Sequence, residues 1–135
     1  GALGYANCAQ EIVAHCKPTG QAFDWLVMAT GSTGTQAGLV AGFAAMAYDL
    51  PVMGVSVRQP HARQVAAVHG LTQRTLEKLG ADPVDVSALR VDDGYVGEGY
   101  GIHAPSTYEA MRMRSCGSNR LPIQTPESGE TQLRR

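Results

Sequence analysis

The sequence predicts an α/β fold, a three-layer sandwich in which a mostly parallel sheet carries helices on both faces. Three observations predict it. Short apolar, β-branched segments alternate with longer segments of helical spacing, in the order strand, helix, strand, helix, strand. The connections are short, which is typical of parallel strands joined by right-handed crossovers. The first strand, 24–30, is apolar almost throughout, which favours burial on both faces of the sheet.

The elements follow one another without a long gap. Helices are expected at 2–17, 35–49, 61–79 and 106–113, and strands at 24–30, 52–57 and 89–91. Pro18-Thr19-Gly20 ends the first helix and Gly80 ends the third. The second helix is so rich in glycine and alanine that we expect it to lie very close to the sheet.

The third helix, 61–79, is the most amphipathic. We expect its inward side chains to be Val65, Val68, Leu76 and Leu79. We expect its outward side chains to be Arg63, Gln64, Arg74 and Lys78.

Composition narrows the classes of protein. The chain has 135 residues, 44% of them hydrophobic and only 17% charged, which predicts one domain or a piece of one. A net charge of −1 gives no indication of nucleic-acid binding, and no apolar run is long enough to cross a membrane. Three widely spaced cysteines support neither a disulfide framework nor a zinc site, so we expect reduced thiols and a cytoplasmic protein. Because the chain begins with Gly1, we expect a fragment or a processed product.

The segment that follows the first strand predicts a phosphate-binding loop. Gly31, Ser32, Thr33, Gly34 and Thr35 lie between an apolar strand and the start of a helix. That layout presents free backbone amides and the positive end of the helix dipole to an anion. The spacing is neither the G-x-G-x-x-G of dinucleotide folds nor, without a lysine, a nucleotide P-loop. A tight turn with no ligand remains the alternative.

Four segments, in order, resemble one enzyme family. They are GALGYANCAQEI (1–12), ATGSTGTQAG with LVAGF (29–43), PVMGVSV (51–57), and DDGYVGEGYG followed by PSTYEAMRM (92–113). Together they resemble the D-cysteine desulfhydrase and 1-aminocyclopropane-1-carboxylate deaminase family, which uses pyridoxal 5'-phosphate (PLP) and has the tryptophan synthase β-like fold. The resemblance implies that residues 1–113 are part of the large PLP-binding lobe.

The resemblance also implies roles for particular residues. The loop from Gly31 to Thr35 would hold the cofactor phosphate, and Tyr100 would be an active-site tyrosine. The family's Schiff-base lysine lies before the point that matches Gly1, and we interpret Lys17 and Lys78 as solvated surface residues. No metal is implied. The substrate would be a small amino acid, and the parent family forms homodimers.

The implied activity is a carbon–sulfur lyase of the D-cysteine desulfhydrase type, inactive in this chain alone for want of that lysine. The loop ATGSTGTQAG resembles the desulfhydrase form more than the deaminase form. Deaminase and cysteate sulfo-lyase activity remain alternatives, as does a phosphate-binding α/β module without catalysis.

The last segment, 114–135, departs from the family. Its composition predicts disorder, and the D-P-V-Y-x-G-K motif of the family is replaced by RSCGSNRLPIQTPESGETQLRR. We hypothesise that a change of reading frame produced this tail. Nucleotide sequence that encodes the motif in another frame would support the hypothesis.

Overall fold

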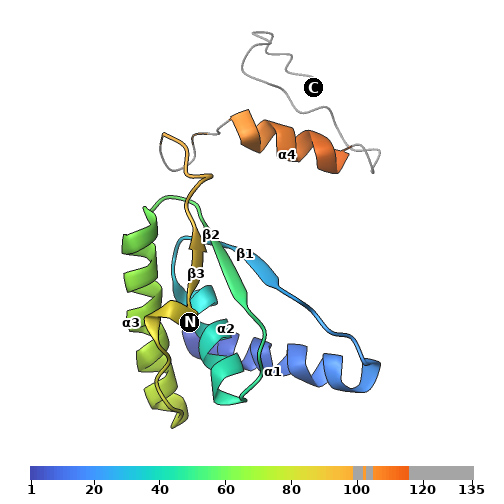
Figure 1. The fold of residues 1–135 in the computed structure, drawn as a ribbon, viewed down its shortest axis with the longest axis vertical. Coiled ribbons are helices and arrows are strands. Elements are labelled where there is room, and N and C mark those ends of the chain that lie inside the picture. The colour runs from blue at the N-terminus through green and yellow to red at the C-terminus, as the bar shows by residue number, and fades with distance from the viewer. Residues whose placement is uncertain (99–101, 103–104, 116–135) are drawn as a thin grey trace, which may run out of the picture. The chain divides into compact units, whose positions relative to one another are not determined.

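The computed structural model describes residues 1–98, 102 and 105–115, and side chains are described up to residue 113. The chain divides into two compact units, Gly1–Val96 and Gly97–Arg135. The first unit carries the sheet and the predicted phosphate loop. Its elements are α1 (Ala2–Thr19), β1 (Leu26–Thr30), α2 (Gly34–Ala45), β2 (Val52–Ser56), α3 (His61–Leu79), the short 3-10 helix η1 (Val86–Ala88) and β3 (Arg90–Asp92) (Figure 1).

The strands form one parallel sheet in the order β1-β2-β3. Thr30, the last residue of β1, pairs with Ser56, the last residue of β2. The predicted α/β fold and its parallel sheet are therefore confirmed. The three strands point the same way, so their carboxyl ends meet at one edge, called here the carboxyl edge, and the opposite edge is the amino edge.

Most predicted boundaries agree with the structure. The third helix has the predicted limits, whereas α1 continues through Pro18 to Thr19 before Gly20 ends it in a left-handed conformation with φ of 64°. Helix α2 ends at Ala45, before the predicted position 49, because Ala47 has a φ of 49°, which is incompatible with a continuing right-handed helix.

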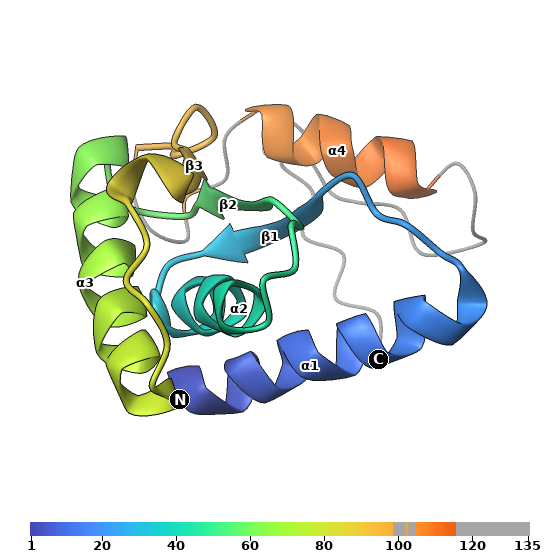
Figure 2. The same ribbon diagram turned by 60° about the horizontal axis from the view of Figure 1, so that its bottom comes forward.

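The expectation that β1 is buried on both faces is wrong. Its side chains alternate, and Val27 is 65% exposed on the face turned away from the helices. Figure 2 shows α1 and α2 on the same side of the sheet. With the strand order β1-β2-β3, two right-handed crossovers place α2 and α3 on one face, so the second helical layer of the predicted sandwich is not part of this unit.

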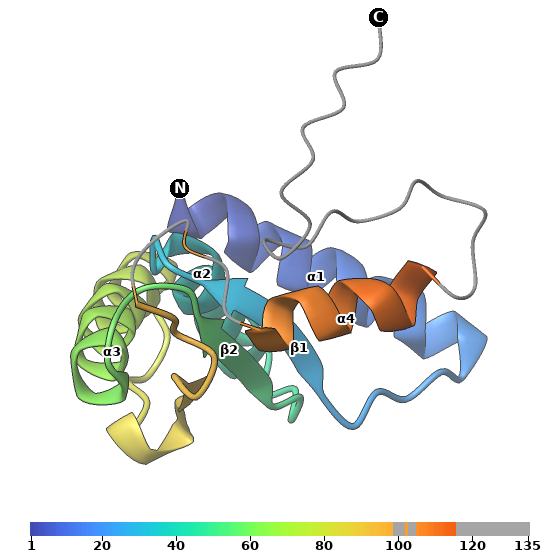
Figure 3. The same cartoon turned by 90° about the horizontal axis from the view of Figure 1, so that it is seen from above.

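Gly38 and Gly42 of α2 face another helix, whereas we expected the small residues of α2 to face the sheet. A Cβ at Gly38 would overlap the carbonyl oxygen of Ala2, and one at Gly42 would lie 2.7 Å from the carbonyl oxygen of Ala6. Helices α1 and α2 therefore pack with their backbones close together, as Figure 3 shows from above. The core beside this contact comprises Ala9, Val13, Leu39, Phe43, Leu50 and Val52.

The predicted faces of α3 are partly wrong. Val68 and Leu76 are buried as expected, but Gln64 is only 1% exposed and Leu79 is 42% exposed. Gln64 lies four residues before Val68 and therefore on the same side of the helix. Leu79 is the last residue of α3, where the chain turns away at Gly80.

The second unit contains α4 (Pro105–Ser115), at the position predicted for the last helix and slightly longer. Among the described residues, no helix is both long and apolar enough to cross a bilayer. The segment 116–135 lies outside the described residues, so the disorder predicted for the tail stays a prediction.

Candidate functional site

The predicted phosphate loop lies at the carboxyl edge of the sheet. Gly31 follows the last residue of β1, and Thr33 is the N-cap of α2, which begins at Gly34. In open parallel sheets, ligands bind outside the carboxyl ends of the strands. The structure therefore brings the five loop residues together where a ligand is expected.

Three amide groups in this loop have no internal partner. In the part of the chain that the structure describes, the amides of Ser32, Thr33 and Thr35 donate no hydrogen bond. The amide of Gly34 donates within the turn to Ser32, and that of Ala37 donates to the carbonyl of Thr33 at 2.9 Å. Three donors at the start of α2 thus remain for an external acceptor.

Thr33 adopts a conformation that threonine rarely takes. Its φ of 53° lies in the left-handed region, which β-branched side chains disfavour. Backbone strain of this kind clusters at ligand sites, where the surrounding fold holds it. This conformation supports a functional role for the turn.

The surroundings of the two loop glycines, Gly31 and Gly34, differ. A Cβ at Gly31 would lie 2.7 Å from Cγ2 of Val57, so this position permits the close approach of the loop to the segment after β2. A Cβ at Gly34 would have no neighbour within 4 Å. The space beside Gly34 is therefore open to a ligand, whereas Gly31 is explained by packing.

The chemistry of the loop fits a phosphate group. The first turn of α2 carries no acidic side chain, so the positive end of the helix dipole is uncompensated. Hydroxyls of Ser32, Thr33 and Thr35 add donors to the free amides. Each hydrogen bond to a charged phosphate contributes about 1.5–3 kcal/mol.

Two buried glutamines were missed as site residues by the sequence interpretation. Gln36, 0% exposed in the first turn of α2, donates from Nε2 to the carbonyl of Arg90 at 2.8 Å and lies over Gly54. Gln64 donates from Nε2 to Oγ1 of Thr30 at 3.0 Å. The spacing of Gln64 to Val68 could have revealed its inward position, but its partner on β1 could not be read from the sequence.

The two lysines lie far along their helices from the loop. Lys17 and Lys78 are exposed and occupy the last turns of α1 and α3. Because α3 returns from the carboxyl edge to the amino edge, Lys78 lies at the end of the sheet opposite the loop.

Two acidic side chains at the end of β3 accept hydrogen bonds from backbone amides. Oδ1 of Asp92 accepts from the amide of Gly94 at 2.8 Å, and Oδ2 of Asp93 accepts from the amide of His61 at 2.7 Å. Asp92 therefore stabilises a turn, and Asp93 accepts from the first amide of α3. Tyr100 lies outside the described residues, so its active-site role stays a prediction.

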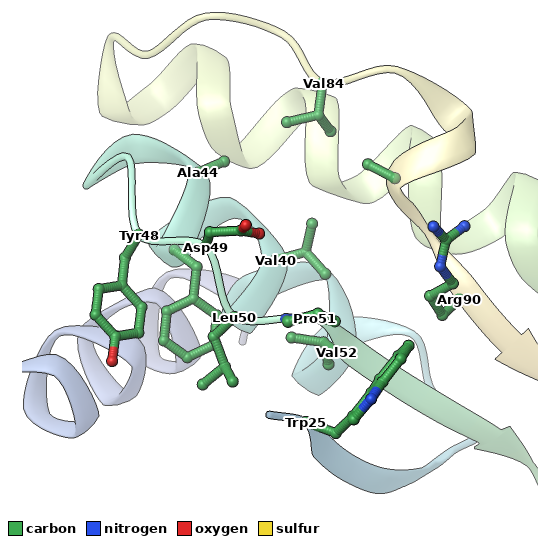
Figure 4. A pocket seen from close by; sticks show the side chains of 12 residues that line it. Trp25, Val40, Ala44, Tyr48, Asp49, Leu50, Pro51, Val52, Val84 and Arg90 are labelled. Carbon is green, nitrogen blue, oxygen red and sulfur yellow. The ribbon is translucent and has the colours of Figure 1, made fainter. Parts of the chain in front are cut away.

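A cavity lies at the amino edge (Figure 4). Its volume is about 320 Å³, and its lining is mostly apolar, with Asp49 and Arg90 as the charged members. Nη1 of Arg90 donates to the carbonyl of Ser87 at 2.7 Å. The lining residues are Trp25, Val40, Phe43, Ala44, Tyr48, Asp49, Leu50, Pro51, Val52, Val84, Ala88 and Arg90.

Comparison with known proteins identifies the family. Residues 1–116 match the family described as pyridoxal-phosphate dependent enzyme. The chain is 32% identical over 115 residues to a 1-aminocyclopropane-1-carboxylate deaminase of Mesorhizobium japonicum, covering 84% of this chain and 34% of the relative. It is 34% identical over 123 residues to the deaminase of a Methylobacterium strain, covering 87% and 34%.

A second activity is represented among the relatives. The chain is 32% identical over 113 residues to a D-cysteine desulfhydrase of Salmonella typhi, covering 84% of this chain and 34% of the relative. The chain thus spans about a third of the length of the curated relatives it matches. These matches confirm the resemblance inferred from the sequence. The chain belongs to the family of pyridoxal-phosphate dependent enzymes.

Proposed function

We propose that this chain forms the phosphate-binding part of a PLP-dependent carbon–sulfur lyase of the D-cysteine desulfhydrase type. The observation that carries the proposal is the set of free amides at Ser32, Thr33 and Thr35, at the positive end of α2 and beside open space. A doubly charged phosphate ester satisfies all three donors. Family membership identifies PLP as the cofactor that carries such a phosphate.

The loop binds one end of the cofactor and thereby fixes its position at the carboxyl edge. PLP, when bound to an amino acid, withdraws electrons from the bonds of the substrate's α-carbon. Residues 31–35 supply binding and orientation only, because none of them is an acid or base near neutral pH.

Tyr100 is proposed as the group that holds or transfers a proton at the substrate. The overall reaction consumes D-cysteine and water and releases sulfide, pyruvate and ammonia. Tyr100→Phe keeps the ring but removes the hydroxyl, so turnover in an active enzyme that carries this segment should fall about 10²-fold or more with little change in cofactor affinity.

We also propose that this chain alone holds PLP without a covalent bond and has little or no lyase activity. Lys17 and Lys78 lie in the last turns of their helices, away from the loop. Borohydride reduction of the chain with PLP should leave Lys17 and Lys78 no more labelled than the N-terminal amine of Gly1. Stoichiometric labelling of either one would contradict this part of the proposal.

The binding experiment compares PLP with pyridoxal, which lacks the phosphate. PLP should bind with a change in its visible absorbance, pyridoxal should bind far more weakly, and inorganic phosphate should compete with PLP. Equal binding of the two compounds would exclude the loop as the site. Phosphate binding without preference for PLP would favour the alternative of a non-catalytic phosphate-binding module.

Deaminase activity is the second candidate, favoured by deaminase relatives of similar identity. Sulfo-lyase activity on cysteate is a further alternative. A chimera tests them: residues 1–113 replace the matching third of the Salmonella desulfhydrase. Sulfide release from D-cysteine supports the first candidate, whereas ammonia from 1-aminocyclopropane-1-carboxylate without sulfide release supports the second. The homodimer of the parent family and a cytoplasmic location are proposed on the same resemblance.

A further inference from the structure

A buried hydrogen bond joins α3 to the residue that precedes the phosphate loop. Nε2 of Gln64 donates to Oγ1 of Thr30 at 3.0 Å, and the two side chains are 1% and 2% exposed. Thr30 is the last residue of β1, and Gly31 follows it directly. The carbonyl of Thr30 also accepts from the amide of Val57 at 3.0 Å, so both its backbone and its side chain are held.

The first turn of α3 is itself fixed to the ends of the other two strands. The amide of His61 donates to Asp93, which follows β3, at 2.7 Å. Just before α3, Ser56 at the end of β2 donates from Oγ to the carbonyl of Gln59 at 2.7 Å and accepts from the amide of Gln59 at 3.1 Å. Hydrogen bonds therefore hold the start of α3 at the carboxyl edge, and the bond from Gln64 connects this part of α3 to β1.

We infer that Gln64, through its hydrogen bond to Thr30, is a positioning residue that sets the place of the phosphate loop. Among the described side chains, Gln64 is the one that hydrogen-bonds to the side chain of Thr30. A small displacement of Thr30 moves Gly31, the next residue, which lies so close to the segment after β2 that a Cβ there would be 2.7 Å from Cγ2 of Val57. Loss of the bond also leaves a buried polar group without a partner, which favours such a displacement.

The experiment uses the whole 135-residue chain and paired substitutions. Thr30→Val removes the acceptor at nearly constant volume, and Gln64→Met removes the donor at similar length. Thr30→Ser keeps the hydroxyl. The matched control is Thr72→Val, because Thr72 is 0% exposed and its hydroxyl donates to the carbonyl of Val68 at 2.8 Å, a hydrogen bond within α3.

The first readout is amide hydrogen exchange by NMR without any ligand. The amides of Val57 and Ala37, bonded to Thr30 and Thr33, report the position of the loop. Both amides should exchange faster in Thr30→Val and in Gln64→Met than in the Thr72→Val control. The amides of α1 should exchange at the same rate in all three variants. The double variant should be no worse than either single variant, since both remove the same bond.

The second readout is affinity for PLP, with inorganic phosphate as a competing probe. We expect Thr30→Val and Gln64→Met to weaken binding about fivefold, and Thr30→Ser and Thr72→Val to leave it within twofold. Unchanged exchange at Val57 and Ala37 in both bond-removing variants would overturn the inference, as would equal effects in the Thr72→Val control. Because the ligand of the loop is itself proposed, a chain that binds no PLP but shows the expected exchange would overturn the proposed function and leave the positioning role standing.

Discussion

The two edges of the sheet offer opposite kinds of site. The amino edge has a cavity of about 320 Å³ lined mostly by apolar side chains, among them the half-exposed Trp25. The carboxyl edge has instead a short loop with free amides, a strained Thr33 and buried hydrogen bonds that fix its surroundings. The amino edge therefore offers a cavity, whereas the carboxyl edge offers free hydrogen-bond donors at the positive end of a helix.

If the loop is the ligand site, as proposed above, cavity volume alone is a poor guide to the site in this molecule. A large apolar pocket is the usual first candidate for a ligand site. At the amino edge, however, Nη1 of Arg90 already donates to the carbonyl of Ser87. The apolar side chains around it cannot replace the water molecules that hydrate a phosphate. Unsatisfied donors at a helix start can do so, and this favours the carboxyl edge.

The largest effect is expected from a negative charge placed at the phosphate loop. Thr35→Asp adds a carboxylate in the first turn of α2, where the helix dipole stabilises it by about 0.3–1 kcal/mol. The same charge repels a phosphate, so affinity for PLP should fall at least about tenfold while stability is kept or raised. Absorbance titration and thermal unfolding measure the two effects.

The control places the same charge at the other edge. Ala88→Asp adds a carboxylate at an exposed position in the lining of the amino-edge cavity. PLP affinity should be unchanged. A larger loss for Ala88→Asp than for Thr35→Asp would assign the cofactor to the amino edge.

The next effect concerns how α1 fixes the start of α2. Gly38→Ala places a Cβ against the backbone of Ala2 and 2.6 Å from Cβ of Tyr5, so the free energy of unfolding should fall by about 1–3 kcal/mol. Gly34→Ala, four residues earlier, meets no atom within 4 Å and should be neutral or stabilising by up to about 1 kcal/mol. Urea denaturation compares the two, and equal losses would show that Gly38 does not pack as described.

A smaller effect is expected in the fluorescence of Trp25, the single tryptophan of the chain. Trp25 lines the amino-edge cavity and is 48% exposed. Titration with inorganic phosphate, which does not absorb its emission, should leave the emission maximum in place while phosphate protects the loop amides from hydrogen exchange. A shift that saturates together with binding would place the anion near Trp25 instead.

The smallest effect is a pH dependence at the amino edge. Hydrogen bonds from Ser87 lower the pKa of Asp85 below its ordinary value, and the nearby His69 adds to the effect. The folded-state pKa lies below the unfolded one, so the carboxylate stabilises the fold above the unfolded pKa and loses this contribution as pH falls through the folded pKa. The stability difference between the wild type and Asp85→Asn should therefore shrink on acidification, with PLP affinity at neutral pH unchanged.

Hydrophobic periodicity and turn residues were sufficient to predict the order of the helices and strands and the position of the loop. Local signals such as Gly80, and the small-residue turn after an apolar strand, act over a few residues, so the sequence alone carries them. The contacts of Gly38 and Gly42 were wrongly assigned to the sheet because a small residue permits close approach without saying to which partner. The prediction that Gln64 faces outward was wrong for a related reason. A polar side chain can be buried when a residue distant in sequence forms a hydrogen bond with it.

Residue types at short spacing were enough to predict the α/β order and the family, which are confirmed, and a phosphate-binding role for the loop 31–35, which stays a prediction. Tertiary structure alone decided which face of β1 is exposed, which helix packs on Gly38, and that Gln64 reaches Thr30 across 34 positions of the chain. These features depend on strand order and crossover direction, which bring together residues that no local pattern relates.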